Sequence, residues 1–220
     1  MVPSDILSDR RALAAGTVKI AAAGVLLILL LVLFADRPFA DWSYGTLHRP
    51  QLFVWMTHIV DPVPVIAVLG LGIQAVALLC GWRPGPLGRA AIAVCLAVLV
   101  GMAVKEVLKN AVGRTWPETW TNGNPSWIRD RVFSVDPFHG GNGWASFPSG
   151  HTTVITAPMA VLWFAIPRWR ILWTVPVLLV AIGLLGCDYH WPSDIVGGWL
   201  VGVAAAVGAL AILRPAGDGR

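Results

Sequence analysis

Residues 190–213 read HWPSDIVGGWLVGVAAAVGALAIL, and the last part of this stretch, 195–213, contains no charged residue. A membrane-spanning helix needs roughly 20 consecutive apolar residues, which this run supplies. Pro192 is of the residue type favoured at the first helical position, so the helix is expected to begin there. His190 and Asp194 stand at the start of this span, where ionisable groups are costly and indicate function.

The rest of the chain repeats this pattern. Of its 220 residues, 56% are hydrophobic and 13% charged, which is typical of a polytopic membrane protein. Five more uncharged runs cover 20–35, 62–82, 90–104, 152–167 and 171–187. We therefore expect an all-α membrane protein of six transmembrane helices in a bundle, forming a single domain over 1–220. The expected helices cover about 14–35, 60–82, 88–111, 150–166, 170–188 and 192–213.

Small residues recur every four positions in the last expected helix, at Gly198, Gly202 and Ala206. Small residues at this spacing let two membrane helices approach closely. The pattern predicts that another helix packs tightly along this face.

The basic residues indicate a topology. With the N-terminus in the cytoplasm, nine of the sixteen basic residues are cytoplasmic, namely Arg10, Arg11, Lys19, Arg83, Arg89, Arg168, Arg170, Arg214 and Arg220. This bias favours both termini inside. Most other basic residues cluster beside the two histidine motifs, which suggests an anionic ligand. A long basic face outside the membrane is lacking, which argues against nucleic-acid binding.

Residues 113–147 form the one long loop that the sequence predicts. Loops of this length are usually functional or disordered. Four tryptophans, Trp116, Trp120, Trp127 and Trp144, argue against disorder and suit a membrane–water interface. A second loop is expected at 36–58, carrying Asp36, Arg37, Asp41, His48 and Arg49.

The first histidine motif, Phe147-Pro148-Ser149-Gly150-His151, opens the fourth expected helix. The free N–H groups of a helix N-terminus bind phosphate well. Gly150 lets the backbone approach a ligand, and Ser149 can cap the helix and donate to a phosphate oxygen. A plain N-cap beside an unrelated histidine is the alternative reading.

The second motif, His190-Trp191-Pro192-Ser193-Asp194, lies on the same membrane face as the first, because one hairpin of two helices separates them. An aspartate can hold one imidazole nitrogen and leave the other free to attack. A purely structural pair of His190 and Asp194 is the alternative. Histidines 48, 58 and 139 lack a partner motif and are expected to be non-catalytic.

Two cations at the end of the third expected helix, Lys109 and Arg114, lie on that same face. Both are candidates for binding phosphate oxygens and offsetting transition-state charge. Helix capping by these basic residues is the alternative. Lys105 is expected to pair with Glu106 or with a phospholipid.

These motifs together resemble the type 2 phosphatidic acid phosphatase superfamily of integral membrane phosphatases. The family pattern is a lysine, six residues and Arg-Pro; then Pro-Ser-Gly-His; then Ser-Arg, five residues, His, three residues and Asp. Pro148-Ser149-Gly150-His151 matches fully, and His190 with Asp194 matches in spacing. Lys109 and Pro117 match the ends of the first part.

Two family arginines are absent. Trp116 stands in place of the arginine before Pro117, and Gly183-Leu184 stands in place of Ser-Arg. Arg114, Arg129 and Arg131 are candidate replacements. We expect at least two of these cations, Lys109 included, to point into the cavity shared by the two motifs.

The resemblance implies a metal-free, two-step mechanism without a cofactor. His190 would attack phosphorus and form a phosphohistidine, while Asp194 orients His190. His151 would protonate the leaving oxygen and then activate water. Consistent with this, no carboxylate cluster in the sequence looks able to hold two metal ions.

The sequence therefore predicts a lipid phosphatase of the bacterial inner membrane whose site faces the periplasm. Its substrate would be a phosphatidate-like lipid, phosphatidylglycerol phosphate, a polyprenyl diphosphate or a lipid A phosphate. A lipid phosphotransferase is an alternative, and so is a non-catalytic lipid-phosphate binding or transport protein, which the missing arginines motivate. The sequence does not indicate an oligomeric state.

Overall fold

The structure is a computed structural model that describes residues 10–120 and 123–213, with side chains from Val18 onward. The longer helices are α1 (Arg10–Phe34), α2 (Asp36–Leu47), α3 (Gln51–Thr57), α4 (Pro62–Leu79), α5 (Pro86–Val112), α7 (Gly150–Ala165), α8 (Arg170–Gly186) and α9 (Pro192–Ile212). Short helical turns are η2 (His58–Val60), α6 (Trp127–Asp130), η3 (Asn142–Trp144) and η4 (Pro167–Trp169). Only isolated β-bridges accompany them in the described part of the chain, so the all-α prediction is confirmed.

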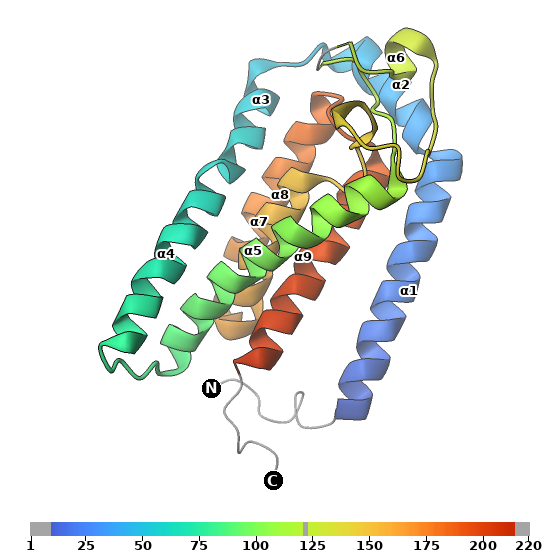
Figure 1. Ribbon diagram of the computed structural model, residues 1–220. Helices are drawn as coiled ribbons and strands as arrows, with labels where there is room; N and C mark the ends of the chain where they lie inside the picture. The colour runs from blue at the N-terminus through green and yellow to red at the C-terminus, as the bar shows by residue number, and fades with distance from the viewer. Residues whose placement is uncertain (1–9, 121–122, 214–220) are drawn as a thin grey trace.

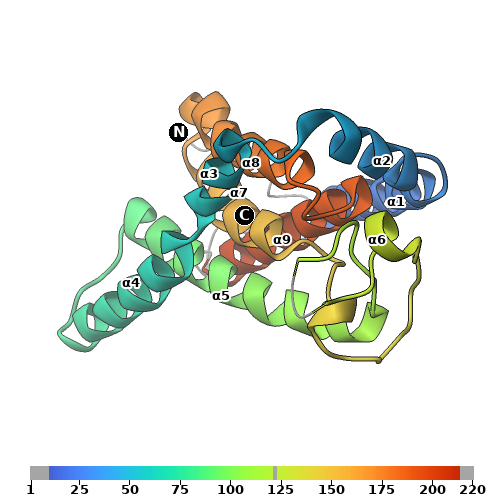
Figure 2. The same cartoon turned by 90° about the horizontal axis from the view of Figure 1, so that it is seen from above.

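Helix α7 lies at the centre of the bundle. It packs against α5, α8 and α9, while α4 lies against α5 and α1 against α9 (Figure 1). Seen from above, α4 stands at one side of the molecule and α1 with α2 at the other (Figure 2). The motif that opens α7 therefore starts from the best-packed helix.

Four helical segments of the described chain are long and apolar enough to cross a membrane, namely Gln51–Leu79, Pro86–Val112, Pro167–Gly186 and Pro192–Ile212. Helices α1 and α2 form a fifth candidate, bent by 61° between Val18–Phe34 and Asp36–Leu47. Helix α7 has 16 residues, or about 24 Å of length, against the roughly 30 Å of a bilayer core. The structure therefore does not confirm the expected six spans.

The loop expected over 36–58 is mostly helical, so that prediction is wrong. Helix α2 buries polar Asp36 and Ser43 and exposes Trp42 and Tyr44. Its polar side faces the protein and its aromatic side faces outward, the reverse of a helix in a soluble protein. Apolar-run counting misses such a helix because the charged residues interrupt the run.

Proline and glycine set the helix ends. Pro62, Pro86 and Pro192 begin α4, α5 and α9, as their missing N–H and fixed φ favour. Gly113 ends α5 with φ +61°, a left-handed conformation that glycine adopts without strain. This turn directs the chain into the loop after α5 and places Arg114 at its start.

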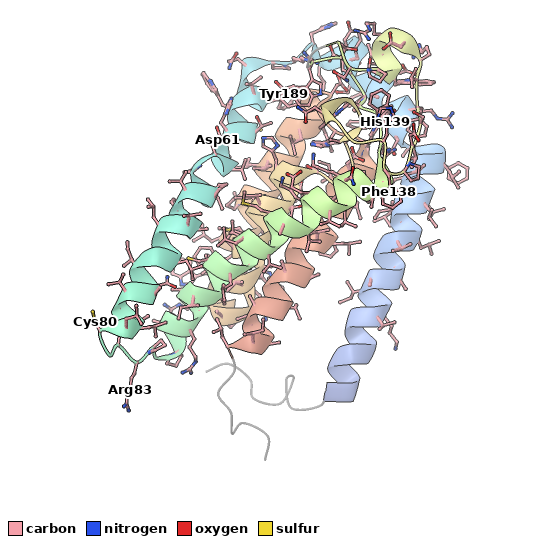
Figure 3. The ribbon with its side chains drawn as sticks, in the orientation of Figure 1. Asp61, Cys80, Arg83, Phe138, His139 and Tyr189 are labelled. Carbon is pink, nitrogen blue, oxygen red and sulfur yellow. The ribbon has the colours of Figure 1, made fainter. Side chains whose placement is uncertain are left out.

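The long loop is folded at one end of the bundle, as the tryptophans indicated. Arg114 bridges to Val135 and to Ala145, so three separate parts of the loop are held together. Figure 3 shows His139 and Phe138 in this loop at the same end as Tyr189, whereas Cys80 and Arg83 mark the opposite end.

The close packing expected along α9 is present. A Cβ on Gly198 would stand 2.5 Å from the carbonyl oxygen of Ser149, and one on Gly202 would stand 2.6 Å from the Cβ of Thr156. Ala206 is fully buried. These contacts bring α9 against α7 and so bring the two histidine motifs together.

We predict that Gly202→Leu destabilises the protein and that Gly208→Leu does not. A side chain at Gly202 collides with α7, and overpacking of this kind costs about 1–3 kcal/mol of unfolding free energy. Gly208 lies on the same helix, and a Cβ there meets no atom within 4 Å. The thermal unfolding midpoint in detergent should fall for the first variant only. Equal midpoints for both variants would contradict the packing described here.

Candidate active site

The structure joins the two histidine motifs directly. The backbone N–H of Ser149 donates to the carbonyl oxygen of Asp194 over 3.1 Å. This bond ties the residue before α7 to the first turn of α9. The side chains of both motifs are therefore fixed relative to each other by main-chain contact.

Asp194 is the centre of the site and is fully buried. Its Oδ1 accepts a hydrogen bond from Arg114 over 2.6 Å. Its Oδ2 accepts from the Ser146 hydroxyl and from the backbone N–H of Trp191. Nδ1 of His190 lies 3.2 Å from the same Oδ2. Both carboxylate oxygens are thus occupied, as a buried charge requires.

His190 comes just before α9 and is 5% exposed. Because Nδ1 faces Asp194, Nε2 is the ring nitrogen left for a reacting group. Burial lowers the pKa of His190, and Asp194 offsets part of that shift. A neutral imidazole with a free Nε2 has the lone pair that a nucleophile needs.

The N-terminus of α7 lies beside this histidine. Ser149 caps the helix, accepting from the N–H and the hydroxyl of Thr152. The amides of Gly150 and His151 come before Thr153, whose N–H donates to the Ser149 carbonyl, so they are the donors that an anion at this end would meet. His151, in the first turn of this helix, is half-buried.

Two lysines of α5 approach this region. Lys109 donates to the carbonyl oxygen of Ala145 and lies 5.3 Å from the centre of the Trp116 ring. The side chain of Lys105 passes Gly150, where a Cβ would stand 3.3 Å from its Cδ. The expected ion pair of Lys105 with Glu106 is present.

The guanidinium of Arg114 is bonded to other side chains of the protein. Arg114 is 3% exposed, and its guanidinium bonds to Asp194, to the Ser193 hydroxyl and, over 2.6 Å, to Asp36. It also packs against the rings of Phe133 and Trp191, whose centres lie 5.1 and 5.3 Å from its Cζ. This placement favours holding a carboxylate over the phosphate contact expected from the sequence.

The other candidate cations are engaged on the loop surface. Arg129 pairs with Asp130, and each group shifts the pKa of the other in the direction that keeps both charged. Arg131 pairs with Asp41 over 2.6 Å. Both arginines are exposed, at 48% and 62% of their side-chain surface.

The positions of the two absent arginines are filled by apolar groups. Trp116 is buried, donates its indole N–H to Asn142 and lies 5.0 Å from the His190 ring. Leu184 is fully buried in the apolar core. Trp116 thus forms a wall of the site beside the histidine, and Leu184 belongs to the helix packing.

The remaining histidines lie outside these contacts. His58 pairs with Asp61 on the exposed turn before α4, and His139 stacks on Trp144 in the loop. His48 ends α2 in a left-handed conformation. Among the described residues, three or more His, Cys, Asp or Glu side chains do not gather as a metal ion would require.

Two buried partners of the site escaped the sequence analysis. Ser146 donates to Asp194 from the loop, and Asp36 accepts from Arg114 at the start of α2. Ser146 carries no distinguishing pattern. Asp36 does, since it is a charged residue at the end of an apolar run, but it was assigned to a loop.

Curated proteins match part of the chain. It is 30% identical over 96 residues to a lipid A 1-phosphatase of Rhizobium johnstonii, covering 44% of this chain and 36% of the relative. It is 34% identical over 58 residues to an undecaprenyl-diphosphatase of Sulfolobus acidocaldarius, covering 26% of this chain and 28% of the relative. The matched stretches thus span less than half of these relatives' lengths.

The fold matches a solved membrane protein. The crystal structure of a transmembrane PAP2-type phosphatidylglycerolphosphate phosphatase from Bacillus subtilis superposes with a TM-score of 0.54, covering 87% of this chain and 94% of that one. The sequences are 18% identical, so the likeness establishes the fold alone.

The family profile of the PAP2 superfamily matches residues 90–217, which is more than half of the chain and includes most of α5 and all of α7, α8 and α9. This match confirms the resemblance drawn from Pro148-Ser149-Gly150-His151 and from His190 with Asp194. The chain is a multi-pass membrane protein that belongs to the PAP2 superfamily.

Proposed function

We propose that this protein is a membrane lipid phosphatase that hydrolyses a phosphomonoester or diphosphate of a lipid through a phosphohistidine. One observation carries the proposal: a buried aspartate holds Nδ1 of His190, and the same aspartate is bonded through its backbone to the residue that caps α7. The proposed nucleophile, His190, and the anion-binding N-terminus of α7 are thereby held at the same site.

In the first chemical step, Nε2 of His190 attacks phosphorus and the bond from phosphorus to the lipid oxygen breaks. His151 donates a proton to that leaving oxygen. Asp194 accepts from Nδ1 throughout and stabilises the positive charge that develops on the ring. The products of this step are the dephosphorylated lipid and phosphohistidine 190.

In the second step, His151 takes a proton from water and the resulting nucleophile attacks phosphorus. The bond from phosphorus to Nε2 breaks and inorganic phosphate leaves. In this proposal the amides of Gly150 and His151, with the Ser149 hydroxyl and Lys109, hold the phosphoryl oxygens in both steps. No step needs a metal ion or a cofactor.

The proposed substrates share a lipid anchor and a terminal phosphoryl group. Relatives named for lipid A and for undecaprenyl diphosphate support this class without choosing within it. The absent arginines leave a lipid-phosphate binding protein as the competing reading, and measured phosphate release decides between them.

We propose that the site faces the periplasm across a bacterial inner membrane, and the distribution of basic residues supports this orientation. Arg83 and Arg89 lie around the turn between α4 and α5, and Arg168 and Arg170 lie between α7 and α8. Arg83 marks the end of the bundle opposite Tyr189 (Figure 3). A cytoplasmic location for the basic end follows from the positive-inside rule. Arg214 and Arg220 lie outside the described residues.

We predict that His190→Ala abolishes phosphate release from a lipid phosphate and that His151→Ala lowers it by about 10²–10⁴-fold, the usual loss for a general acid–base group. His139→Ala is the matched control, because its ring stacks on Trp144 away from these contacts. Release is measured in EDTA across a panel of lipid phosphates. Near-normal turnover by the His190 variant would refute the mechanism, and addition of lipid or sugar acceptors would reveal phosphotransfer.

The acid limb of kcat/KM should have its midpoint below about 6.5, the usual histidine pKa. Burial is the largest cause that lowers the pKa of His190, Asp194 raises this pKa, Lys109 and Arg114 lower it further, and the net shift is downward. Protonated His190 cannot attack, so on this limb activity is lost as the pH falls through the lowered pKa of His190. A midpoint above pH 7 in the measured pH–rate profile would contradict the burial of a neutral His190.

Labelling with a membrane-impermeant maleimide tests the topology. Cys80 is exposed near Arg83, whereas Cys95 and Cys187 are buried. Cys80 should react in inverted vesicles and stay unreacted in intact spheroplasts. A Phe138→Cys, Cys80→Ala variant should show the opposite pattern, because Phe138 is exposed at the end of the bundle that carries the site. Reaction of Cys80 in spheroplasts would place the site in the cytoplasm.

A further inference from the structure

A second buried carboxylate, Asp36, lies next to the site and has no part in the chemical steps above. It is the first residue of α2, directly after the 61° bend that separates α2 from α1. It is fully buried. An ionised carboxylate in such a place is costly unless its oxygens are bonded, so its partners reveal what it does.

Asp36 bonds to two groups that adjoin Asp194. Its Oδ1 accepts the backbone N–H of Ser193 over 3.0 Å, and its Oδ2 accepts the Ser193 hydroxyl over 2.5 Å. The same Oδ2 accepts from Arg114 over 2.6 Å. Asp36 thus binds both the first turn of α9, through Ser193, and one nitrogen of the Arg114 guanidinium.

Arg114 bridges the two carboxylates with separate nitrogens. Its Nη2 donates to Asp36, and its Nη1 donates to Oδ1 of Asp194. The rings of Phe133 and Trp191 also pack against the guanidinium. Because Oδ1 of Asp194 is fixed in this way, Oδ2 remains directed at Nδ1 of His190.

We propose that Asp36 is a positioning residue for the reaction, acting through Arg114 and Ser193 to keep Asp194 turned toward His190. This inference rests on the proposed phosphatase function. It assigns a role in the reaction to the first bent helix pair, which lies outside the residues 90–217 that match the family profile.

Charge gives a second reason for this role. Asp36, Arg114 and Asp194 together carry one net negative charge, and attack by His190 creates a positive charge on its ring. Replacing Asp36 with a neutral residue leaves the three groups with no net charge and frees Nη2 of Arg114 to compete for Asp194. Both effects weaken the stabilisation of the charged ring, so the chemical step slows.

The effect should appear in kcat and not in KM. Arg114 and Ser193 stand between Asp36 and the groups that would bind phosphate, so substrate affinity does not depend on Asp36 directly. We expect Asp36→Asn to lower kcat by about tenfold or more, on the order of one charge-assisted contact, with KM changed less than about twofold. Formation of labelled phosphohistidine should slow in the same proportion.

Asp41→Asn is the matched control. Asp41 lies on the same helix but is exposed and pairs with Arg131 and with the indole of Trp127. The Asp41→Asn variant should leave kcat, KM and the rate of phosphohistidine formation at their wild-type values. Thermal unfolding midpoints of all variants are measured in the same detergent, and rates are expressed per folded protein.

A second variant covers the case in which Asp36→Asn folds poorly. Ser193→Ala removes a hydroxyl bonded to both Asp36 and Arg114 but keeps every charge, and it should lower kcat more mildly at unchanged KM. Histidine labelled with ¹⁵N adds a readout without turnover, because the Nδ1–H signal of His190 should move in both variants and stay in Asp41→Asn.

Unchanged kcat per folded protein in the Asp36 variant overturns the inference, as does a loss confined to KM. If Asp36→Asn folds poorly, unchanged kcat in Ser193→Ala overturns it. A wild-type chain that releases no phosphate from any lipid phosphate refutes the proposed function, which is a different result from an active wild type with an unaffected Asp36 variant.

Discussion

A buried aspartate that must stay ionised is the constraint on which the rest of this structure depends. Asp194 sits at the end of an apolar bundle, where an unpaired carboxylate would be costly. Removing one partner from a buried pair costs about 3–5 kcal/mol, a large part of the stability of most domains. The fold therefore supplies a guanidinium, a hydroxyl, an imidazole and a backbone amide to one side chain.

The long loop is ordered for the same reason. Two of the partners of Asp194, Arg114 and Ser146, lie in this loop, and the Ser146 N–H bonds to the Arg114 carbonyl. A loop tied to a buried charge at two points cannot leave the bundle without exposing that charge. Folding of the loop and formation of the site are thus one event. The stability of the N-terminal end of α9 depends on Arg114 and Ser146, which lie about 50 to 80 positions earlier in the chain.

Much of the fold was readable from the sequence because apolar runs and prolines act locally. Helices α5, α8 and α9 begin and end within two residues of the expected limits. The two histidine motifs were also identified. The helical nature of 36–47 was missed because its buried side is polar, and no local pattern shows that Asp36 meets Arg114 across 78 positions. Helix α7 also begins and ends within one residue of the expected 150–166, but its 16 residues are too few for the full span that the sequence predicts.

The two absent arginines change how such a site must hold a phosphate. Trp116 places an aromatic ring beside His190, and Leu184 adds apolar contact to the core, so neither offers a charge. In the proposed mechanism the negative phosphoryl group then relies on Lys109 and on helix amides, which are fixed dipoles and need no reorganisation during reaction. The guanidinium of Arg114 lies nearby, but it is paired with the carboxylates of Asp36 and Asp194. In the proposed mechanism those carboxylates orient the nucleophile, so Arg114 helps to position His190 and less positive charge remains for the substrate.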